Sequence, residues 1–479
     1  MTVPLLNWPI AAGVRTPLVE QIVSHCVEQI RHRRWPAGAR LPSIRQLAAH
    51  YGISSFTVHN AYERLNAEGW LRSRPGAGYY VARGDEPGGG LAEANAAGSR
   101  LAADVALMRQ TLQPAPGALP VGCGTLPDGW LPEAMLRGAL RELARQGGAL
   151  TAYGTPQGYL PLRQQLAARL ADWRIAAEPA QLLLTAGASQ ALDLVLRLML
   201  KPGDAVLVDS PSFYNFHACL RLHGARLLPV PRTRQGPDLT ALKHALAEHR
   251  PRLFLTNSVL HNPTGTSLSP PVAHRVLQLL AQYDCVAIED DIYADFAEPG
   301  ACRLAALDGL ERVIYLGSFS KTLSANLRVG FVAASAERVA ALTDIKLITG
   351  MSTPQALEQL VHRLLTGGQY RRHVDALRRR LAAAQAEVLP SLAEHGCAPW
   401  ATPEGGYLAW VALPDGTSAD ALAAAASRHG VWLAPGRHFT LEDDADRFVR
   451  VNLAHALEPR FWHFLDGALG APPGGVRDA

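Results

Sequence analysis

Residues 182–334 contain six short apolar runs, and longer stretches with helical periodicity separate them. Continuous apolar strands that alternate with helices are typical of a mostly parallel sheet buried between two layers of helices. We therefore predict an α/β domain with strands at Leu182–Thr185, Ala205–Asp209, Arg252–Thr256, Val286–Glu289, Val313–Leu316 and Gly330–Ala334. The helices expected between and beside them are Ser189–Leu200, Ser212–His223, Thr240–His249 and Pro270–Tyr283.

Such sheets bind ligands beyond the carboxyl ends of their strands, so the residues that follow each strand are candidate site residues. The glycine turn at residues 185–189 opens a helix, whose free backbone N–H groups suit a phosphate. Glu289-Asp290-Asp291 ends a buried strand with clustered carboxylates, which is costly unless a positive group lies opposite. Asn262-Pro263-Thr264-Gly265 and Ser318-Phe319-Ser320-Lys321 follow two further strands. Each of these motifs, taken alone, is also compatible with an ordinary loop that joins a strand to the next helix and binds no ligand.

Taken together and in this order, these motifs resemble those of fold-type I pyridoxal 5′-phosphate (PLP) enzymes, specifically class I/II aminotransferases, over residues 121–465. The resemblance implies a mostly parallel large-domain sheet and a smaller C-terminal α+β subdomain. It implies that Lys321 forms a Schiff base (internal aldimine) with PLP, which requires an amine of lowered pKa. Asp290 matches the carboxylate that keeps the pyridine nitrogen protonated.

The same resemblance assigns the other contacts to the cofactor and substrate. Asn262 and Tyr293 match residues that hydrogen-bond the 3′-oxygen of the ring, and Phe213 matches the aromatic residue on the ring face. Arg450 matches the arginine that clamps a substrate α-carboxylate, although a structural ion pair would also account for it. The phosphate cup is assigned to Ala188, Ser189, Ser318, Ser320 and Arg328.

Two further points concern the partner subunit and the loop after the lysine. Tyr153 matches a tyrosine that reaches the phosphate of the partner subunit, which implies a homodimer. Ala325-Asn326 stands where the family commonly has Pro-Gly. Because asparagine tolerates left-handed backbone, we expect the loop to keep its form.

The N-terminal part differs from the rest in charge. Residues 1–83 carry 10 arginines and 4 acidic residues, a net of +6, whereas the remaining residues carry 36 basic and 38 acidic residues, a net of −2. Helical patterns at residues 17–31, 43–50 and 54–67 precede two short strands, Trp70–Ser73 and Gly78–Val81. This order predicts a winged helix-turn-helix, whose third helix enters the major groove of DNA. The alternative with the same helix pattern is a three-helix bundle that does not bind DNA and whose arginines only face solvent.

The segment Leu41–Ala48, together with Gly52-Ile53-Ser54 and Ala61–Leu65, resembles the GntR-type winged helix over residues 15–82. The resemblance implies that double-stranded DNA is a partner. Ser55 stands where that family often has a base-reading arginine, and Phe56 where a polar residue is common, so the usual operator cannot be carried over. The residues expected to contact DNA are Arg45, Ser54, Ser55, Thr57, His59, Arg64, Arg72, Arg74 and Gly78.

Residues 83–118 have glycine and proline at both ends and an alanine-rich middle, and we predict that they link the head to a body at residues 119–479. A GntR-like head joined to an aminotransferase-like body resembles the MocR (GabR-like) transcription regulators. The implied function is a cytoplasmic, PLP-dependent DNA-binding regulator that senses an amino compound or a B6 vitamer. The alternatives are a catalytically active aminotransferase with an accessory head, and a body that senses only vitamin B6.

Composition argues against several other classes. No run of about 20 apolar residues predicts a membrane span, and the basic and apolar pattern of a secretory signal is not evident. Six scattered cysteines without CxxC pairing predict reduced thiols rather than disulfides or a zinc site, so no metal site is expected. Only four lysines accompany 42 arginines, and the resemblance assigns the cofactor to one of those four.

Overall fold

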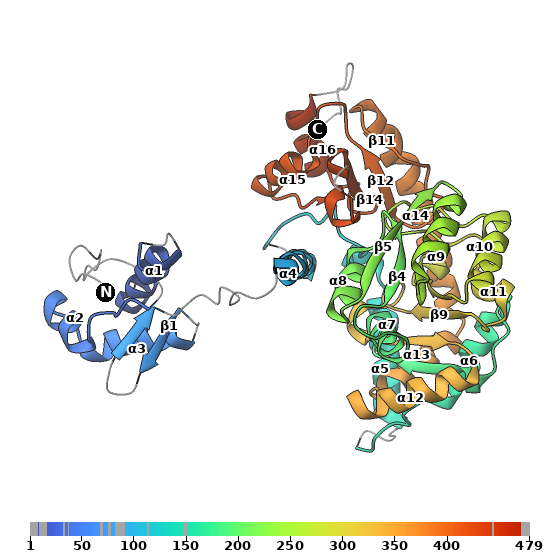
Figure 1. Ribbon diagram of the computed structural model, residues 1–479, viewed down its shortest axis with the longest axis horizontal. Coiled ribbons are helices and arrows are strands. Elements are labelled where there is room, and N and C mark those ends of the chain that lie inside the picture. Colours follow the sequence, from blue (N-terminus) through green and yellow to red (C-terminus); the bar gives the residue numbers. More distant parts are fainter. Residues whose placement is uncertain are drawn as a thin grey trace. The chain divides into compact units, whose positions relative to one another are not determined.

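The computed structural model describes residues 8, 17–31, 34–36, 38–67, 70–74, 78–81, 92–112, 115–146, 151–442 and 445–470. They divide into two compact units, a head within residues 1–96 and a body within residues 97–479. Figure 1 labels elements of both units where there is room.

Before α4 (Ala92–Leu112), the described residues of the head form three helices and a two-stranded antiparallel sheet, as the sequence predicts. Its second helix begins with a capping box, in which Ser43 Oγ accepts a hydrogen bond from Gln46 N, and Gln46 Oε1 accepts one from Ser43 N. The elements are α1 (Leu18–Arg31), α2 (Ile44–Tyr51), α3 (Ser55–Ala67), β1 (Leu71–Arg74) and β2 (Gly78–Val81). The inward face of α3 is fully buried at Val58, Ala61, Tyr62 and Leu65. The opposite face of α3 is therefore left to solvent.

Helix α4 (Ala92–Leu112) crosses the boundary between the two units. Its C-terminal half packs on the body, where Leu107 is buried and Asp104 forms an ion pair with Arg221 of α8 (Tyr214–Leu222). Figure 1 shows this part of α4 beside α8. Residues 97–112, which the sequence analysis assigned to the linker, thus belong to the compact unit of the body.

The large subdomain of the body is built on an eight-stranded sheet in the order β3-β10-β9-β8-β7-β4-β5-β6. The neighbours from β5 through β4, β7 and β8 to β9 are parallel, and β10 runs antiparallel to both β3 and β9. The mostly parallel sheet that was expected is confirmed. The strands are β3 (Leu182–Thr185), β4 (Ala205–Ser210), β5 (Arg226–Thr233), β6 (Gly236–Pro237), β7 (Leu253–Thr256), β8 (Val286–Asp290), β9 (Val313–Ser318) and β10 (Gly330–Ala333).

Helices cover both faces of this sheet, because successive side chains of a strand point to opposite faces. Leu182 and Leu184 pack into one layer of helices, and Leu183 packs into the other. The first layer contains α5 (Glu133–Gln146), α6 (Leu160–Asp172), α9 (Leu239–His249), α10 (Pro270–Gln282), α11 (Leu304–Asp308) and α13 (Gln355–Thr366). The second contains α7 (Ala188–Met199), α8 and α12 (Ala336–Gly350).

The long helix α14 (Gln369–Glu394) joins the large subdomain to a smaller C-terminal one (Figure 1). The small subdomain has an antiparallel sheet in the order β11-β12-β14-β13, with α15 and α16 packed on it, and this is the α+β subdomain that the resemblance implies. The first residues of the body also join it, since Gly122 N donates to Trp432 O at 2.8 Å. Its elements are β11 (Ala398–Pro399), β12 (Leu408–Ala412), α15 (Ala419–Arg428), β13 (Ala434–Pro435), β14 (Phe448–Asn452) and α16 (Pro459–Leu469).

Three further properties concern membrane spans, metal sites and thiols in the described part of the chain. None of the helices described is both long and apolar enough to span a bilayer. The described side chains form no group of three or more His, Cys, Asp or Glu that is suited to a metal ion. All six cysteines lie in the described ranges and are free thiols.

Candidate cofactor site and DNA-binding face

Lys321 lies just beyond the carboxyl end of β9. Its Nζ donates a hydrogen bond to the carbonyl oxygen of Gly124 at 2.5 Å and lies 5.8 Å from the centre of the Tyr293 ring. Burial, and then the positive charge of Arg450, lower the pKa of Lys321 to about 8. An amine with this pKa is partly neutral near neutral pH, and a neutral amine can attack a carbonyl carbon.

A second buried lysine shows how a structural amine is held in this fold. Lys346 on α12 is fully buried, and its Nζ donates to Pro156 O at 2.7 Å, Leu184 O at 2.8 Å and Thr353 Oγ1 at 3.2 Å. These three bonds use all of its donors. Lys321 has a single hydrogen bond within the described residues, so its amine retains hydrogens for a ligand.

Asp290 is the last residue of β8 and is buried. Its Oδ1 accepts a hydrogen bond from Ile292 N at 3.2 Å, and Asn257 Nδ2 donates to its backbone oxygen at 2.7 Å. Burial raises the pKa of Asp290 to about 7. None of the ion pairs formed among the described residues includes Asp290. A buried carboxyl group of this kind is suited to a protonated ring nitrogen of a ligand.

Arg450 on β14 is completely buried and meets Asn262. Its Nη1 donates to Asn262 Oδ1 at 2.9 Å, and its Nη2 and Nε donate to Gly122 O at 2.7 and 3.2 Å. Asn262 Nδ2 in turn lies 3.5 Å from the hydroxyl of Tyr293. The ion pairs of the described residues do not include Arg450, so the structural ion pair considered above is not found there. No carboxylate of the described residues therefore lies opposite this guanidinium.

The turn before α7 forms a cradle for an anion. Gly187 has a φ of +82°, and no side chain caps the first N–H groups of α7. Arg328 Nη2 donates to Ala186 O at 2.9 Å, and a Cβ added to Gly187 would lie 2.8 Å from this nitrogen. Ser318 Oγ and Ser320 Oγ lie 3.0 Å apart on the neighbouring segment. The close approach of Arg328 to free N–H groups fits a phosphate.

Phe213 directly precedes α8, and its ring lies 4.7 Å from that of Tyr214. Tyr214 is not among the residues predicted from the sequence. Its ring lies 5.8 Å from Arg450 Cζ, and its hydroxyl lies 3.2 Å from Thr111 Oγ1 in the last turn of α4. The position next to Phe213 was the only sequence signal, because the contact with α4 joins segments far apart in the chain.

The carbonyl that accepts from Lys321 is held by residues of the small subdomain, which the sequence analysis also missed. Tyr407 donates its hydroxyl hydrogen to Gly124 O at 3.0 Å. Asn452 Nδ2 donates to Cys123 O at 3.1 Å and to Thr125 O at 2.7 Å. The segment around Gly124 is thus fixed by Tyr407, which directly precedes β12, and by Asn452 of β14, and the site lies where the two subdomains meet.

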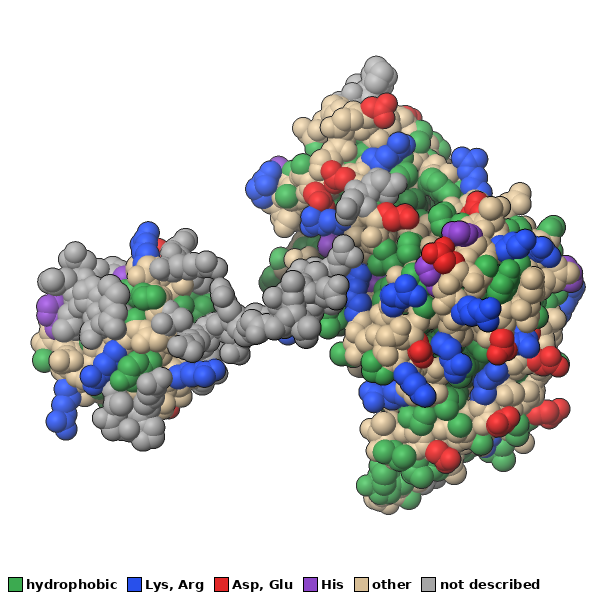
Figure 2. All heavy atoms as spheres, in the orientation of Figure 1, with side chains coloured by type: hydrophobic (Ala, Val, Ile, Leu, Met, Phe, Trp, Pro, Cys, Tyr) green, Lys and Arg blue, Asp and Glu red, His purple; other side chains and the backbone are tan. Residues whose placement is uncertain are grey.

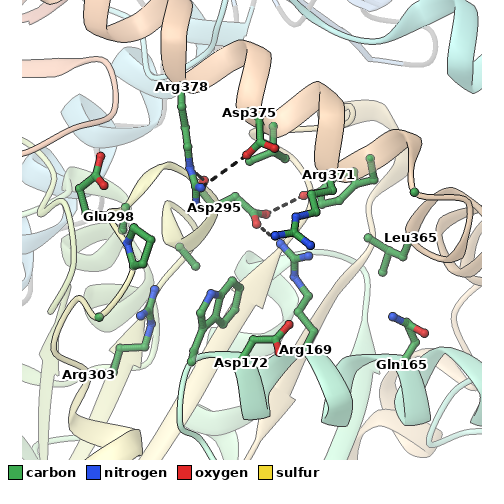
Figure 3. Close-up of a pocket in the computed structure, with 18 of the residues that line it drawn as sticks. Gln165, Arg169, Asp172, Asp295, Glu298, Arg303, Leu365, Arg371, Asp375 and Arg378 are labelled. Atoms are coloured by element: carbon green, nitrogen blue, oxygen red, sulfur yellow. Dashed lines mark hydrogen bonds and ion pairs between the residues drawn. The ribbon is translucent and has the colours of Figure 1, made fainter.

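A cavity of about 550 Å³ lies beside this site, between α6, α14 and the segment that follows β8 (Figure 3). Asp295 in its wall forms an ion pair with Arg169 and accepts a hydrogen bond from the hydroxyl of Tyr370 at 2.6 Å. The same hydroxyl lies 2.7 Å from Thr322 Oγ1. Because Thr322 directly follows Lys321, this network fixes the backbone beside the lysine.

Tyr153 lies apart from these residues. Its side chain is 82% exposed, and the hydrogen bonds of the described residues do not connect it to the site. The role that the resemblance assigns to it requires a second subunit, so it stays a prediction.

The residues predicted to contact DNA are distributed over α2, α3 and the hairpin of the head. Ser54 Oγ accepts a hydrogen bond from Phe56 N at 3.1 Å and so caps α3, whose residues Ser55 and His59 are exposed and whose Thr57 is half-buried. Arg64 forms an ion pair with Glu20 of α1 at 2.8 Å. Arg45 and Arg72 are exposed, and Gly78 opens β2 with a φ of +100°. Arg74 ends β1, and its side chain lies outside the described part. Their contacts with DNA stay predictions.

Comparison with known proteins assigns both units to families. The model of bacterial regulatory proteins of the gntR family matches residues 18–81, and that of aminotransferase class I and II matches residues 119–460. The HTH-type transcriptional regulator YdcR of Escherichia coli (strain K12) is 32% identical over 451 residues, which are 91% of this chain and 94% of that protein. The probable rhizopine catabolism regulatory protein MocR of Rhizobium meliloti is 27% identical over 81% of this chain and 79% of its own length. The chain belongs to the MocR-type transcription regulators.

The body of this MocR-type regulator is also similar to aminotransferases. A 2-aminoadipate transaminase of Thermus thermophilus is 35% identical over 347 residues, 71% of this chain and 86% of that enzyme. The crystal structure of LysN, an alpha-aminoadipate aminotransferase from Thermus thermophilus, has a TM-score of 0.70 and 31% identity, covering 79% of this chain and 99% of its own. That structure contains N-(5′-phosphopyridoxyl)-L-leucine. The lysine, the buried carboxyl group and the anion cradle described above fit PLP, the cofactor of the aminotransferase family.

Proposed function

We propose that this MocR-type regulator acts in the cytoplasm, holds PLP at Lys321, and changes its binding to DNA in response to an amino compound or a B6 vitamer. The observation that carries the proposal is a pair of cationic groups in the site, the Lys321 amine with a single hydrogen bond and the buried Arg450 guanidinium without a carboxylate partner among the described residues. Burying an unpaired guanidinium is costly, so its retention favours a carboxylate ligand in addition to the cofactor. The ligand class that fits both groups is an α-amino acid.

Bound PLP supplies an aldehyde that reacts with amines and a ring that accepts electrons. The residues of the chain bind and orient the ligands around it. Arg450 offers a planar fork of donors to the α-carboxylate, and Asn262 holds that fork in place. Lys321 Nζ, with its lowered pKa, would exchange a proton with the amino compound. Burial raises the pKa of Asp290, and a protonated ring nitrogen beside this carboxyl group would favour its ionised form.

Helix α4 is the proposed path from this site toward the head. Its residue Thr111 meets Tyr214, which lies between Phe213 and Arg450, and its residue Asp104 is paired with Arg221 on α8. A ligand that engages Arg450 shifts the surroundings of Tyr214 and therefore biases the position of α4. Coupling of this kind needs two states that the ligand binds with different affinity.

We further propose that two copies of the body form a dimer. The end of α12 carries an apolar patch, Leu347, Ile348 and Met351, whose exposed fractions are 42, 84 and 51%. Lys346 in the same turn donates to Pro156 O, which brings the patch beside the segment that carries Tyr153. Figure 2 shows hydrophobic side chains gathered at the end of the body where α12 lies. Contiguous exposed apolar surface is typical of protein interfaces, and a dimer would present two heads to two DNA half-sites.

The second candidate function is catalysis of transamination. The same unpaired Arg450 and the similarity to a 2-aminoadipate transaminase favour it. In that case the head is accessory to the enzyme. The two candidates share the site and differ in the event that ligand binding triggers, a change in DNA affinity or turnover of the ligand.

One pair of measurements separates them. The full-length protein is tested by mobility shift on the DNA upstream of its own gene, with and without PLP and with a panel of amino acids. The same preparation is assayed for conversion of those amino acids with a keto acid. DNA binding that depends on PLP, with negligible turnover, supports the regulator. Fast turnover without DNA binding refutes it and supports the enzyme.

A further inference from the structure

Helix α3 presents one large apolar side chain to solvent. Phe56, its second residue, is 71% exposed, whereas Val58, Tyr62 and Leu65 on the same helix are fully buried. Within the described part of the head, no other large hydrophobic side chain is exposed to this degree. The ring contributes little to the core of the head, so its position on this helix needs another explanation.

Polar side chains surround Phe56 on the exposed face of α3. His59, Asn60 and Glu63 follow at three, four and seven residues, so they continue the same face of the helix, and all are exposed. Glu63 Oε1 accepts a hydrogen bond from the hydroxyl of Tyr79 on β2 at 2.5 Å, which ties the far end of this face to the hairpin. We call Phe56, His59 and Asn60 the reading face. One apolar residue among polar ones is too little apolar surface for a stable protein interface.

The reading face has the composition of a surface that contacts base edges. Amide and imidazole groups donate and accept hydrogen bonds in the major groove, and the 5-methyl group of thymine is the apolar group on that edge of the bases. Phe56 lies in the first turn of α3, the end of a recognition helix that contacts bases. Its neighbours Ser55 and Thr57 are short, so no long side chain at those two positions extends beyond the ring.

We propose that Phe56 packs against the 5-methyl group of a thymine in the major groove and thereby fixes thymine at one position of each half-site. This inference rests on the proposed function, in which α3 enters DNA. The net charge of +6 on residues 1–83 supplies the attraction to phosphates, while Phe56 supplies discrimination between bases.

The test removes a single methyl group from the DNA. The full-length protein, loaded with PLP, selects its preferred sites from a random duplex library. Each thymine of the selected site is then replaced in turn by deoxyuridine, which lacks only the 5-methyl group. We expect one replacement per half-site to weaken binding about fourfold, the effect of withdrawing about one buried methyl group. We expect Phe56→Ala to weaken binding to thymine DNA by a similar factor and to bind both DNAs equally, and Phe56→Leu to retain part of the difference.

The control is Leu307→Ala on α11 of the body, which also truncates an exposed apolar side chain and is expected to change neither affinity. Thermal unfolding of Phe56→Ala should match the parent protein, because the ring is exposed. DNA binding that is unaffected by every deoxyuridine, or a Phe56→Ala variant that still distinguishes the two DNAs, overturns this inference alone. A change in oligomeric state of Phe56→Ala without a methyl effect also overturns it, since the ring would then contact a second head. No DNA binding at all overturns the proposed function together with this inference.

Discussion

The hydroxyl of Thr111 lies 3.2 Å from the hydroxyl of Tyr214. Thr111 belongs to α4, the helix that continues across the boundary toward the head, and the Tyr214 ring lies 5.8 Å from Arg450 Cζ. One aromatic residue thus separates the candidate carboxylate-binding guanidinium from the linker helix. We propose that a ligand bound at Arg450 acts on α4 through this contact.

We expect Tyr214→Phe and Thr111→Val to reduce the change in DNA affinity that an amino acid causes, because each removes one half of this contact. The effect of both changes together should equal that of either one, as for two groups of a single interaction. PLP binding should remain, since neither hydroxyl belongs to the cofactor set. Titration of labelled DNA at fixed PLP, with and without the amino acid, measures the effect.

A matched control for Thr111→Val is Thr343→Val on α12. Thr343 Oγ1 bonds Val339 O, as Thr111 Oγ1 bonds Leu107 O, but no hydrogen bond to a tyrosine is found for it in the described residues. An equal loss of response in Thr343→Val would show that threonine hydroxyls matter only through helix stability, and would contradict the role given to Tyr214.

The lowered pKa of Lys321 predicts the pH dependence of cofactor capture. The neutral amine is the reactive form, so the rate at which apoprotein takes up PLP should increase with pH, with a midpoint near 8. Removal of the Arg450 charge, as in Arg450→Gln, raises the pKa of Lys321 and should move the midpoint to higher pH. The visible absorbance of the bound cofactor, followed from about pH 6 to about pH 10, checks both expectations. Lys321→Ala should show no such absorbance, whereas exposed Lys243→Ala should behave as the parent.

Arg450 should matter for the carboxylate of the ligand and little for its amine. Arg450→Gln should weaken binding of an amino acid by roughly 1.5–3 kcal/mol, the usual contribution of a hydrogen bond to a charged group. The decarboxylated amine of the same side chain should bind equally to both proteins. Spectral titration of the PLP form with both ligands makes the comparison. A parallel loss for the amine would assign Arg450 to the scaffold rather than to ligand recognition.

The apolar patch at the end of α12 predicts the effect of a charge on assembly. Ile348 is 84% exposed, so Ile348→Glu should leave the folded subunit intact while it places a carboxylate in the proposed interface. Sedimentation velocity should then show a shift from dimer to monomer. Leu222→Glu, at a similarly exposed leucine on α8, is the control. A protein that is monomeric before any substitution would contradict the proposed dimer.

The large sheet shows which strands can be predicted from apolar sequence patterns and which cannot. Strands β3, β4, β7, β8, β9 and β10 have continuous apolar sequences and were predicted within one or two residues. Strand β5 was missed, because Pro229 and Pro231 interrupt its pattern and its side chains are only partly buried near the edge of the sheet. Prolines of this kind are tolerated where a strand lies near a sheet edge. Its identity as a strand is decided by its pairing with β4.

The candidate site likewise combines residues that the sequence predicts with contacts that only the folded structure reveals. Lys321, Asp290 and Asn262 follow predicted strands, so the sequence alone placed them at one edge of the sheet, because parallel strands end on the same side. That reasoning could not reach Gly124, which accepts from Lys321, or Thr111, which meets Tyr214. Those contacts bring together residues about a hundred or more positions apart, and no local pattern encodes such a distance.

The sequence by itself determined the two units, the secondary structure at their cores and the chemical types of the site residues, because apolar periodicity and motif order are local properties of the chain. Tertiary structure decided which charged side chains of the body keep donors, or lack a charged partner, among the described residues. It left the Lys321 amine with one hydrogen bond while it saturated Lys346, and it buried Arg450 without a carboxylate among the described residues. It also turned Phe56 to solvent on α3. Hydrogen bonding and burial depend on what the fold brings opposite each side chain, and that is set only when distant segments pack together.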